Sequence, residues 1–441
     1  MSDPLPTVAI FGASGLIGSS IAISPRREGI RVVPIARRFT KSQLSAFGEA
    51  AVTSDFAEMP SDALAGLLVG ADIRVNCVGI LQDGRQGDTG TIHHDFVNRL
   101  IGVQSHLPNC PLLVHVSIPG QESDDATAFS RTKREAEKIL SDNPNPYVVL
   151  RPGFVIADAA FGGSALVRAL AASPFGVPAA AENRPFAITG VEDIEATVSV
   201  LCNQWREGTR DWSAMWDVMA RETTSFGQVV DAFRERLGVV PTPRFRSPPW
   251  KLRLGALCGD AAAALGWAPP IRSTSLKEMQ RGVEGAPEDW IAATGVTPSS
   301  LSEALGKRPA SIQEKWFSRL YLLKGLIVPF LAVFWALSGL IVLTMAHDAA
   351  TAILTTHGFS MLLAHAVTVS SSFMDIAVGL LIATRKTCRF GLIAGIVVSV
   401  FYMGMAAILT PEMWIEPLGA LVKTGPAIVL MIVALVMQEE R

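Results

Sequence analysis

A glycine-rich stretch near the start of the chain carries the residues best suited to chemistry. It follows the apolar run 8–11 and leads into the helix-compatible stretch 16–23. Its seven residues are Gly12, Ala13, Ser14, Gly15, Leu16, Ile17 and Gly18. Glycines at this spacing permit a tight turn and bring backbone N–H groups close to an anion at a helix start. The stretch therefore predicts a diphosphate-binding turn, and hence a bound nucleotide.

A pair of arginines indicates which nucleotide this is. The next predicted strand, 31–36, is followed by Arg37 and Arg38, and Arg37 lies 19 residues after Gly18. An acidic side chain there would accept a hydrogen bond from a ribose 2′-hydroxyl, whereas a basic pair suits a 2′-phosphate. We therefore predict NADP(H) as the cofactor, with NAD(H) as the alternative. A merely solvated arginine pair is the other interpretation.

The elements that position these residues alternate between strand and helix. Further strands are predicted at 51–56, 73–79, 112–117 and 147–150, and helices at 61–69, 92–105 and 130–141. This alternation predicts an α/β fold with a doubly wound parallel sheet, whose ligand lies beyond the carboxyl ends of its strands. Asp55 and Phe56 end the third strand and are candidates to hold the adenine ring. Val78 and Gly79 end the fourth, where a small residue lets the backbone pass close to the cofactor.

The charge content divides the chain into a polar and an apolar part. From residue 320 onward 12 of 122 residues are charged, whereas the first 319 residues hold 66 charged residues. Four apolar segments follow, at about 322–345, 358–383, 390–409 and 417–437. Each has about the 20 residues that a helix needs to cross a bilayer. We predict an all-α four-helix transmembrane bundle.

The loops between the segments predict the orientation. Basic residues precede the first span and fill the second connection, at Lys315, Arg319, Arg385, Lys386 and Arg389, whereas the first and third connections hold no Lys or Arg. The excess of positive charge marks the cytoplasmic side. We therefore predict a multi-pass protein of the inner (cytoplasmic) membrane with both termini in the cytoplasm.

Other compositional features narrow the function. The net charge of −2 argues against a nucleic-acid partner. Five cysteines are scattered without a Cys-x-x-Cys pair, so no metal site and no disulfide framework is predicted.

Several motifs in order resemble the short-chain dehydrogenase/reductase superfamily, in its extended or atypical branch. They are the Gly12, Gly15, Gly18 spacing, Asn76-Cys77-Val78-Gly79, Ser117, Lys133 and Arg151-Pro152-Gly153, and they cover about residues 1–300. The resemblance implies an NAD(P)-binding Rossmann domain. It also implies that Ser117 and Lys133 are catalytic, that Lys133 binds the nicotinamide ribose, and that Pro152 borders the cofactor. The regions around His94 and His115 are similar to a subgroup containing a complex I accessory subunit.

One position departs from that family pattern. The family places a proton-transferring Tyr four residues before the Lys, and here that residue is Phe129. Phenylalanine has no ionisable group, so ordinary carbonyl reduction is put in doubt. His93 or His94 is a candidate proton donor, with a solvated loop as the other interpretation. His115, on a predicted strand, is expected to be a core residue.

The C-terminal part resembles the DoxX-like membrane family, through Pro417-Leu418-Gly419 and Lys423-Thr424-Gly425-Pro426. We predict three parts: a Rossmann-like dehydrogenase domain at 1–240, the remainder of a substrate region with a linker at 241–318, and a DoxX-like four-span membrane domain at 319–441. Ser225 is expected to cap an amphipathic helix at 225–237. The segment 250–265, with two basic residues near Trp250, is expected to pack within the domain, and a place on the membrane surface is the alternative.

Three ionisable residues fall inside the predicted spans: His365, Asp375 and Lys423. Because charge is costly in hydrocarbon, each is a functional candidate. His365 and Lys423 lie at similar depth, so they could share a site, and Lys423 could reach toward Asp375. Snorkelling of Lys423 and a protonated or helix-capping Asp375 are the structural alternatives.

The sequence thus favours a membrane-anchored, atypical NADP(H)-binding oxidoreductase. We expect this enzyme to pass reducing equivalents to a quinone-like or other lipid-soluble acceptor. One alternative is a non-catalytic nucleotide-binding scaffold or redox sensor, because Phe129 replaces the tyrosine. Another is an isomerase or lipid-modifying enzyme. A small-molecule or lipid-soluble substrate is expected, together with a membrane-complex partner or a homo-oligomer.

Overall fold

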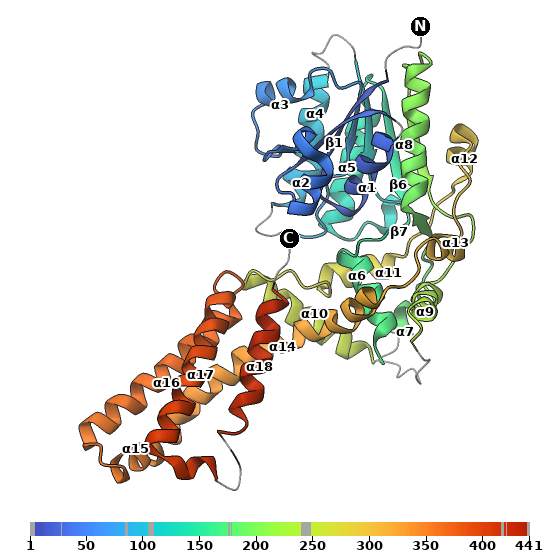
Figure 1. Ribbon diagram of the computed structural model, residues 1–441. Coiled ribbons are helices and arrows are strands. Elements are labelled where there is room, and N and C mark those ends of the chain that lie inside the picture. The colour runs from blue at the N-terminus through green and yellow to red at the C-terminus, as the bar shows by residue number, and fades with distance from the viewer. Residues whose placement is uncertain are drawn as a thin grey trace. The chain divides into compact units, whose positions relative to one another are not determined.

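The fold is seen in a computed structural model of the 441-residue chain (Figure 1). The structure describes residues 5–27, 29–83, 87–104, 110–174, 177, 179–239, 248–415, 419 and 421–438. Two compact units divide it. The first comprises residues 1–259 and 270–319, and the second comprises residues 260–269 and 320–441.

The first unit is built on a seven-stranded parallel sheet. Its strands are β1 Thr7–Phe11, β2 Arg31–Ala36, β3 Val52–Thr53, β4 Ile73–Asn76, β5 Leu112–Val116, β6 Tyr147–Pro152 and β9 Ser213–Val218. The order across the sheet is β3-β2-β1-β4-β5-β6-β9, so the direction of winding reverses between β1 and β4. In register, Phe11 lies beside Ile35 of β2 and Asn76 of β4. The predicted doubly wound parallel sheet is confirmed.

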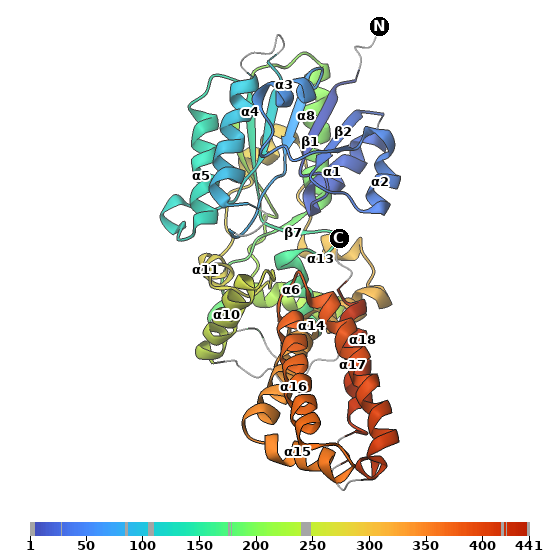
Figure 2. The same ribbon diagram turned by 90° about the vertical axis from the view of Figure 1, so that its left-hand side faces the viewer.

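Helices cover both faces of this sheet (Figure 2). The helices of the sheet region are α1 Leu16–Arg27, α2 Lys41–Phe47, α3 Ser61–Leu68, α4 Phe96–Gln104, α5 Ala128–Ser141 and α8 Val191–Arg206, with a π-helical turn η2 at Gly90–Asp95 and 3₁₀ turns η1 at Gly48–Ala50 and η3 at Glu122–Asp124. One apolar core joins α1 and α8 to the sheet, and a second joins α3, α4 and α5 to its other face. Strands buried on both sides explain the near-continuous apolar runs of the sequence.

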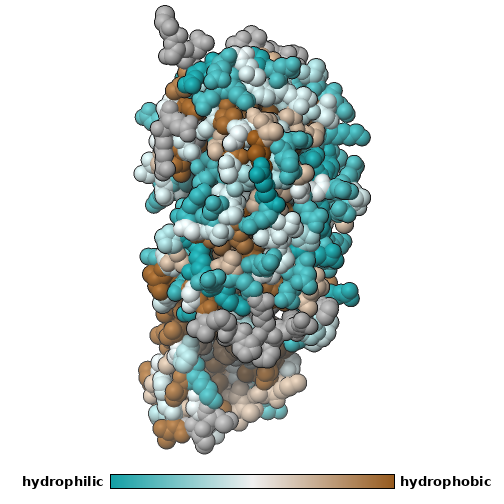
Figure 3. All heavy atoms as spheres, turned by 90° about the vertical axis from the view of Figure 1, so that its right-hand side faces the viewer, coloured by the Kyte–Doolittle hydropathy of each residue, from teal (hydrophilic) through white to brown (hydrophobic). Residues whose placement is uncertain are grey.

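A smaller lobe follows within the same unit. A two-stranded parallel sheet pairs β7 Phe154–Ile156 with β8 Ile188–Gly190. Around it lie α6 Gly162–Ala172, α7 Ala179–Glu182, α9 Phe226–Arg236, α10 Pro249–Ala264, α11 Ser273–Arg281 and α13 Leu301–Gly306. Helix α12 Glu288–Thr294 instead packs on the large sheet beside α8, where the Trp290 indole donates to the Thr197 hydroxyl at 2.9 Å. The predicted cap of α9 is confirmed, because the Ser225 side chain accepts a hydrogen bond from the backbone N–H of Gln228. The face of this unit drawn in Figure 3 is covered mainly by hydrophilic residues.

The second unit is helical. It contains most of α14 Ile312–Thr344, then α15 His347–Thr356, α16 Met361–Ala383, α17 Cys388–Leu409, the 3₁₀ turn η4 Pro411–Trp414 and α18 Thr424–Val436. Glycines let these helices approach closely: a Cβ on Gly379 of α16 would lie 2.7 Å from the carbonyl oxygen of Ala332 on α14. The core contains Trp335, Leu392 and Met431, from three of the helices.

Three of these helices, α14, α16 and α17, are long and apolar enough to cross a membrane. The segment predicted as a fourth span, 417–437, is represented by α18, which has 13 residues and is shorter than a typical span. Residues 416–418 and 420, which include part of the Pro417-Leu418-Gly419 motif, lie outside the described residues. The fourth span and the orientation of the termini remain predictions.

Candidate nucleotide-binding and catalytic site

The predicted glycine turn lies where the sheet changes its direction of winding. It joins the carboxyl end of β1 to α1, next to the end of β4. Gly12 has a positive φ of 76°, and a Cβ there would lie 3.0 Å from the backbone of Cys77. A Cβ on Gly18 would lie 2.3 Å from the Gly12 carbonyl oxygen. Both positions therefore require glycine, and the turn lies against the β4 end where an α/β sheet binds its ligand.

The first turn of α1 supplies what a diphosphate needs. The first four N–H groups of a helix have no partner within the helix, and the helix dipole favours an anion there. The Gly15 N–H closes the turn onto the Gly12 carbonyl at 2.9 Å, and the Gln43 side chain donates to the Ser14 carbonyl at 3.2 Å. The turn is thus held from two sides. Such a turn at the start of a helix is the kind of site that binds a diphosphate.

The end of β4 is ordered by a buried polar pair. The Asn76 side chain accepts a hydrogen bond from the Val78 N–H at 3.0 Å and pairs with Nδ1 of His115 at 3.1 Å. His115 is fully buried on β5, as expected for a core residue, and burial holds its pKa well below the usual value. Burial also raises the pKa of the Cys77 thiol to about 12, so this thiol is neutral. The pair fixes the backbone at Val78 and Gly79, which the sequence assigned to the cofactor.

Lys133 joins the ends of two central strands. Its Nζ donates to the carbonyl oxygens of Val116 at 2.8 Å and Val78 at 3.1 Å, and the side chain is buried. Burial lowers the pKa of Lys133 to about 8. An ammonium has three donors, so one remains after these two bonds. Gly79 lies beside it, since a Cβ there would stand 3.5 Å from Nζ.

Phe129 lies one helical turn before Lys133 on α5, and its neighbour is His93. The two rings meet edge to face with centroids 5.5 Å apart. His93 is buried, its Nε2 accepts from the Ile80 N–H at 3.1 Å, and its Nδ1 pairs with the Thr132 hydroxyl at 2.9 Å. A nitrogen that accepts from a backbone N–H carries no proton, so Nδ1 holds the proton of a neutral ring.

His93 is therefore not a proton donor at neutral pH. Burial, together with the nearby Lys133 charge, lowers the pKa of His93 to about 2. The prediction of a solvated loop is also wrong for this residue, because it packs against α5 from the turn η2. His94 is different: it lies at the surface, where its ring pairs with Asp95 at 2.8 Å.

An ion-pair network borders Ser117 at the end of β5. The Arg151 guanidinium donates two hydrogen bonds of 2.9 and 2.6 Å to the Glu137 carboxylate, and Arg134 forms a salt bridge of 3.0 Å with the same carboxylate. Burial would raise the pKa of Glu137, but the hydrogen bonds and charge of Arg151, together with the charge of Arg134, hold it below its usual range. Ser117 is buried beside this carboxylate. Its surroundings thus include a charged group that the sequence did not indicate.

A second segment closes over the same edge of the sheet. Arg281, at the end of α11, binds Asp125 at 3.0 Å and donates to the Pro119 carbonyl, and Glu278 accepts a hydrogen bond from Thr127. Gln82 donates to Ser275 of α11 at 2.9 Å. Helix α11 is therefore fastened to the loops that follow β4 and β5, beside the N-terminus of α5. No sequence pattern pointed to these contacts, which join residues more than 100 positions apart.

The remaining predicted cofactor residues lie in three different surroundings. Arg37 and Arg38 directly follow β2, where Arg37 is half-buried and Arg38 is exposed. The glycine turn contacts the same strand, because the Ala13 N–H donates to the Ile35 carbonyl at 3.1 Å. Asp55 is exposed in the turn after β3, which is shorter than predicted. Phe56 is buried against Phe11, with ring centroids 5.4 Å apart, and so belongs to the core.

Pro152 is buried at the end of β6. The next residue, Gly153, must be a glycine, because a Cβ at this position would lie 2.5 Å from the Ala187 carbonyl oxygen. This glycine lets the chain pass from the large sheet to the small one. The Arg151-Pro152-Gly153 motif thus has a structural role in addition to the pairing of Arg151 with Glu137.

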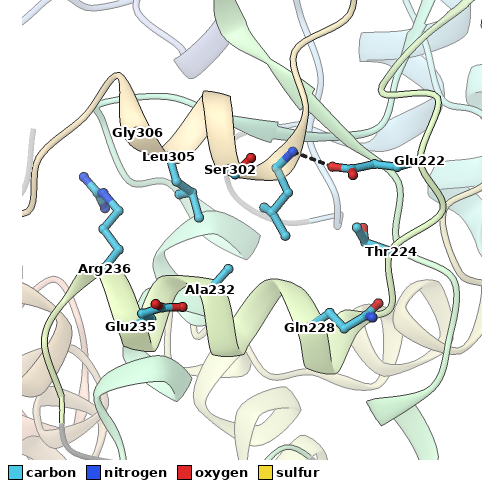
Figure 4. Close-up of a pocket in the computed structure, with 10 residues that line it drawn as sticks. Glu222, Thr224, Gln228, Ala232, Glu235, Arg236, Ser302, Leu305 and Gly306 are labelled. Atoms are coloured by element: carbon cyan, nitrogen blue, oxygen red, sulfur yellow. Dashed lines mark hydrogen bonds between the residues drawn. The ribbon is translucent and has the colours of Figure 1, made fainter.

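A separate pocket of about 570 Å³ lies in the smaller lobe (Figure 4). Helix α9 supplies Gln228 and Arg236, α13 supplies Leu305, and Glu222 accepts a hydrogen bond from the Leu301 N–H at 2.6 Å. None of the residues that line this pocket belongs to the glycine turn or contacts Lys133. The pocket is therefore distinct from the candidate nucleotide site.

The three intramembrane candidates do not form one site. The partner of Asp375 is Tyr402 on α17, whose hydroxyl donates to the carboxylate at 3.1 Å. His365 stacks on His347 with ring centroids 4.9 Å apart. Lys423 is exposed and directly precedes α18. Among the described residues no hydrogen bond or ion pair joins His365, Asp375 and Lys423, so the expected contact of Lys423 with Asp375 is wrong.

Comparison with known proteins divides the chain in the same way. Residues 332–432 match the model of the DoxX-like family. They form a DoxX-like domain. This domain contains the last part of α14, all of α15, α16 and α17, and most of α18, and the expected resemblance is confirmed for it. No curated protein sequence matches the chain.

Solved structures resemble the first part of the chain. The enzyme WbmF of Bordetella bronchiseptica in complex with NADH aligns with a TM-score of 0.50 and 14% identity over 72% of this chain and 93% of that one. The UDP-glucuronic acid 4-epimerase of Bacillus cereus, in complex with UDP-glucuronic acid and NAD, aligns with a TM-score of 0.49 and 15% identity over 71% of this chain and 99% of that one. At such identity the likeness shows the fold alone. The Rossmann-like fold expected for residues 1–300 is confirmed as a fold.

Proposed function

We propose that this chain is a membrane-anchored oxidoreductase that binds NADP(H) and passes hydride to a lipid-soluble, quinone-like acceptor. The observation that carries the proposal is the glycine cradle at the β1–β4 reversal, with a DoxX-like helical domain in the same chain. The similar enzymes whose complexes contain NAD or NADH support a nicotinamide dinucleotide as the ligand.

Two observations support the choice of acceptor. Phe129 stands where a carbonyl reductase needs an acid, and His93 beside it is neutral with both ring nitrogens engaged. Reduction of a quinone needs one hydride from NADPH and one proton, and the quinone oxygens can take that proton from water. The products are NADP⁺ and a hydroquinone. Such a reaction does not require a protein acid aligned with the hydride.

Within this reaction the nicotinamide supplies the hydride, and the described residues bind and orient it. The α1 N-terminus would hold the diphosphate, and Arg38, which is exposed directly after β2, would bind the 2′-phosphate. Lys133 offers its third N–H to a ribose hydroxyl while its other two fix the strand ends. Preference for NADP(H) over NAD(H) is part of the proposal.

The test is NADPH oxidation by the purified full chain in nanodiscs, followed at 340 nm with a short-chain quinone. We expect NADPH to be oxidised faster than in a mixture of quinone and NADPH without protein. One hydroquinone should form for each NADPH consumed. A matched variant, Gly18→Ala, should lose this turnover because its new methyl group meets the Gly12 carbonyl. No turnover in a chain that binds NADPH would overturn the proposed reaction.

A nucleotide-binding sensor is the second candidate, and Phe129 favours it. Such a protein binds NADP(H) and changes its interactions without consuming it. Phe129→Tyr distinguishes the two: the new hydroxyl would lie one turn before Lys133, the spacing of the dehydrogenase pattern. Appearance of aldehyde or ketone reduction in this variant, with none in the parent, would indicate a site that retains its geometry but lacks its acid. Binding without turnover in both proteins would favour the sensor.

A further inference from the structure

Helix α10 carries an exposed apolar stripe along its length. Trp250, Leu254 and Leu257 are 60%, 53% and 63% exposed, and Ala261 and Ala264 continue the series as exposed residues. Residues at this spacing of four and three lie along one side of a helix. The expectation that segment 250–265 packs within the domain is therefore wrong for this side. A run of large apolar side chains open to solvent marks an interaction surface.

The other side of α10 is packed. Ala256 is buried, and a Cβ on Gly259 would lie 2.0 Å from the Ile271 carbonyl oxygen. Glycine at 259 thus lets the chain that follows the helix return closely beside it. Small residues thus form the packed side of α10, and its large apolar residues face outward.

The segment that continues from α10 is attached to the ends of the membrane helices. Residues 260–269 belong to the helical unit. The Trp267 indole donates to the carbonyl of Ala383, the last residue of α16, at 2.7 Å. The Arg385 N–H donates to the Leu265 carbonyl at 3.1 Å, and the Arg385 guanidinium lies 5.3 Å from the centre of the Trp267 ring. Indole and guanidinium groups at span ends are typical of the membrane–water interface.

The length of chain between these contacts and the stripe is short. Leu257 precedes Leu265 by eight residues, which is about 12 Å along a helix. The stripe therefore begins only about two helical turns from a segment that is fixed at the end of a span. The chain thus runs directly from the stripe to helices that are apolar enough to cross a membrane and whose outer faces carry exposed side chains such as Phe330 and Phe390. We therefore take lipid as the partner of the stripe.

The charges near the stripe specify the kind of lipid. Lys251 and Arg253 are exposed beside it, and Lys251 lies 5.7 Å from the centre of the Trp250 ring. The first acidic residue of α10 is Asp260, near its end. Basic side chains beside exposed aromatic and leucine residues suit an interfacial helix on an anionic surface.

We propose that α10 is an interfacial helix, which lies in the headgroup region of an anionic leaflet with Trp250, Leu254 and Leu257 inserted toward the acyl chains. This docking helix adds its own contact with lipid to those of the membrane-spanning helices. It requires only that the DoxX-like domain is in a bilayer, and it does not depend on the proposed oxidoreductase reaction.

The test uses the full chain in nanodiscs, with a nitroxide spin label on a cysteine introduced as Leu254→Cys or Leu257→Cys. The exposed native residues are first changed as Cys110→Ser and Cys258→Ser. Glu135→Cys, an exposed position on α5, is the matched control. Accessibility to oxygen, which concentrates in the acyl region, is compared with accessibility to the water-soluble complex nickel-EDDA. Discs contain phosphatidylcholine alone or with 30% phosphatidylglycerol.

We expect the labels at 254 and 257 to be several-fold more accessible to oxygen than to the nickel complex, relative to position 135, in the discs that contain phosphatidylglycerol. Lys251→Glu with Arg253→Glu should move both labels toward the accessibility of the control. Nickel accessibility equal to that at position 135 would overturn the proposal. So would protection from both reagents, because it would indicate a protein partner. Equal insertion in both lipids, unaffected by the charge reversal, would overturn the requirement for anionic lipid.

Discussion

At the scale of single residues, the candidate site keeps the lysine of the dehydrogenase pattern and has a phenylalanine in place of its tyrosine. Lys133 remains in a position to bind, but the residue one turn before it is Phe129, and the imidazole closest to that ring is uncharged. The sequence predicted that Lys133 contacts a ribose and did not predict its two carbonyl partners. Those carbonyls belong to residues 55 and 17 positions away, so only the packing of β4 and β5 against α5 brings them together.

Arg38 should determine the choice between the two nicotinamide dinucleotides. Arg38→Ala removes a cation beside the expected 2′-phosphate, so NADPH affinity should fall by about tenfold or more, the loss typical of a charge-assisted hydrogen bond. NADH affinity should change little. Isothermal titration with both nucleotides measures this. Lys41→Ala, an exposed cation at the start of α2, is the control for net charge. An equal loss for both nucleotides would contradict the assignment of a 2′-phosphate site.

Lys133 should impose a pH dependence on nucleotide binding. Burial lowers its pKa to about 8, so it is charged at pH 7 and loses its charge as pH rises through 8. Attraction to the dinucleotide diphosphate then weakens, and the NADPH dissociation constant should rise between pH 7 and 9. No inflection is expected between pH 5 and 7 from His93, because its pKa is about 2. In Lys133→Met the dissociation constant should be flat from pH 7 to 9, and the same rise in that variant would refute this origin.

At the scale of elements, backbone geometry explains which predictions succeeded. The glycine turn was predictable because a strand, three spaced glycines and a helix follow one another locally. The third strand was predicted at 51–56, but β3 is Val52–Thr53, since the chain turns after Ser54 and buries Phe56 beside Phe11. Hydropathy could not distinguish a buried strand residue from a buried turn residue. The role of His93 was not predictable either, because its partners lie on a different element.

The glycine turn should be sensitive to one methyl group. Gly18→Ala places a Cβ 2.3 Å from the Gly12 carbonyl, so the turn must open and NADPH binding should fall by at least 100-fold. Gly102→Ala on α4 is the matched control, because nothing lies within 4 Å of its new Cβ and alanine favours a helix by about 1 kcal/mol. Titration calorimetry measures the affinities, and circular dichroism verifies that both variants fold. Retained binding in Gly18→Ala would contradict the role given to this turn.

The hydrogen bond between Asp375 and Tyr402 should contribute measurably to the membrane domain. It joins α16 and α17 at 3.1 Å, and a hydrogen bond between membrane helices is worth about 0.6 kcal/mol on average. A double-mutant cycle with Asp375→Ala and Tyr402→Phe, measured by unfolding in mixed micelles, should give a coupling energy of about that size. Ser370→Ala, exposed on α16, should couple to neither. Strictly additive losses would show that the two side chains do not interact.

At the scale of the whole molecule, composition alone separates two kinds of unit. The fall in charged residues after 320 coincides with the beginning of the helical unit, and the DoxX-like match lies inside it. The number of spans was harder to predict. Gly419 has a positive φ of 57° and Lys423 precedes α18, so the apolar segment 417–437 is not one continuous helix. A hydropathy average counts apolar residues and cannot register such a turn.

The salt bridges of Glu314 determine where the chain can be shortened. Glu314 lies in the first turn of α14, yet it binds Arg168 at 2.9 Å and Arg236 at 2.6 Å, and the Arg168 side chain is only 1% exposed. A soluble fragment that stops at residue 311 would leave the Arg168 guanidinium buried without its anion, a loss of about 3–5 kcal/mol for a buried pair. Anyone who wishes to express the nucleotide-binding part alone should therefore retain the opening turn of the first apolar helix.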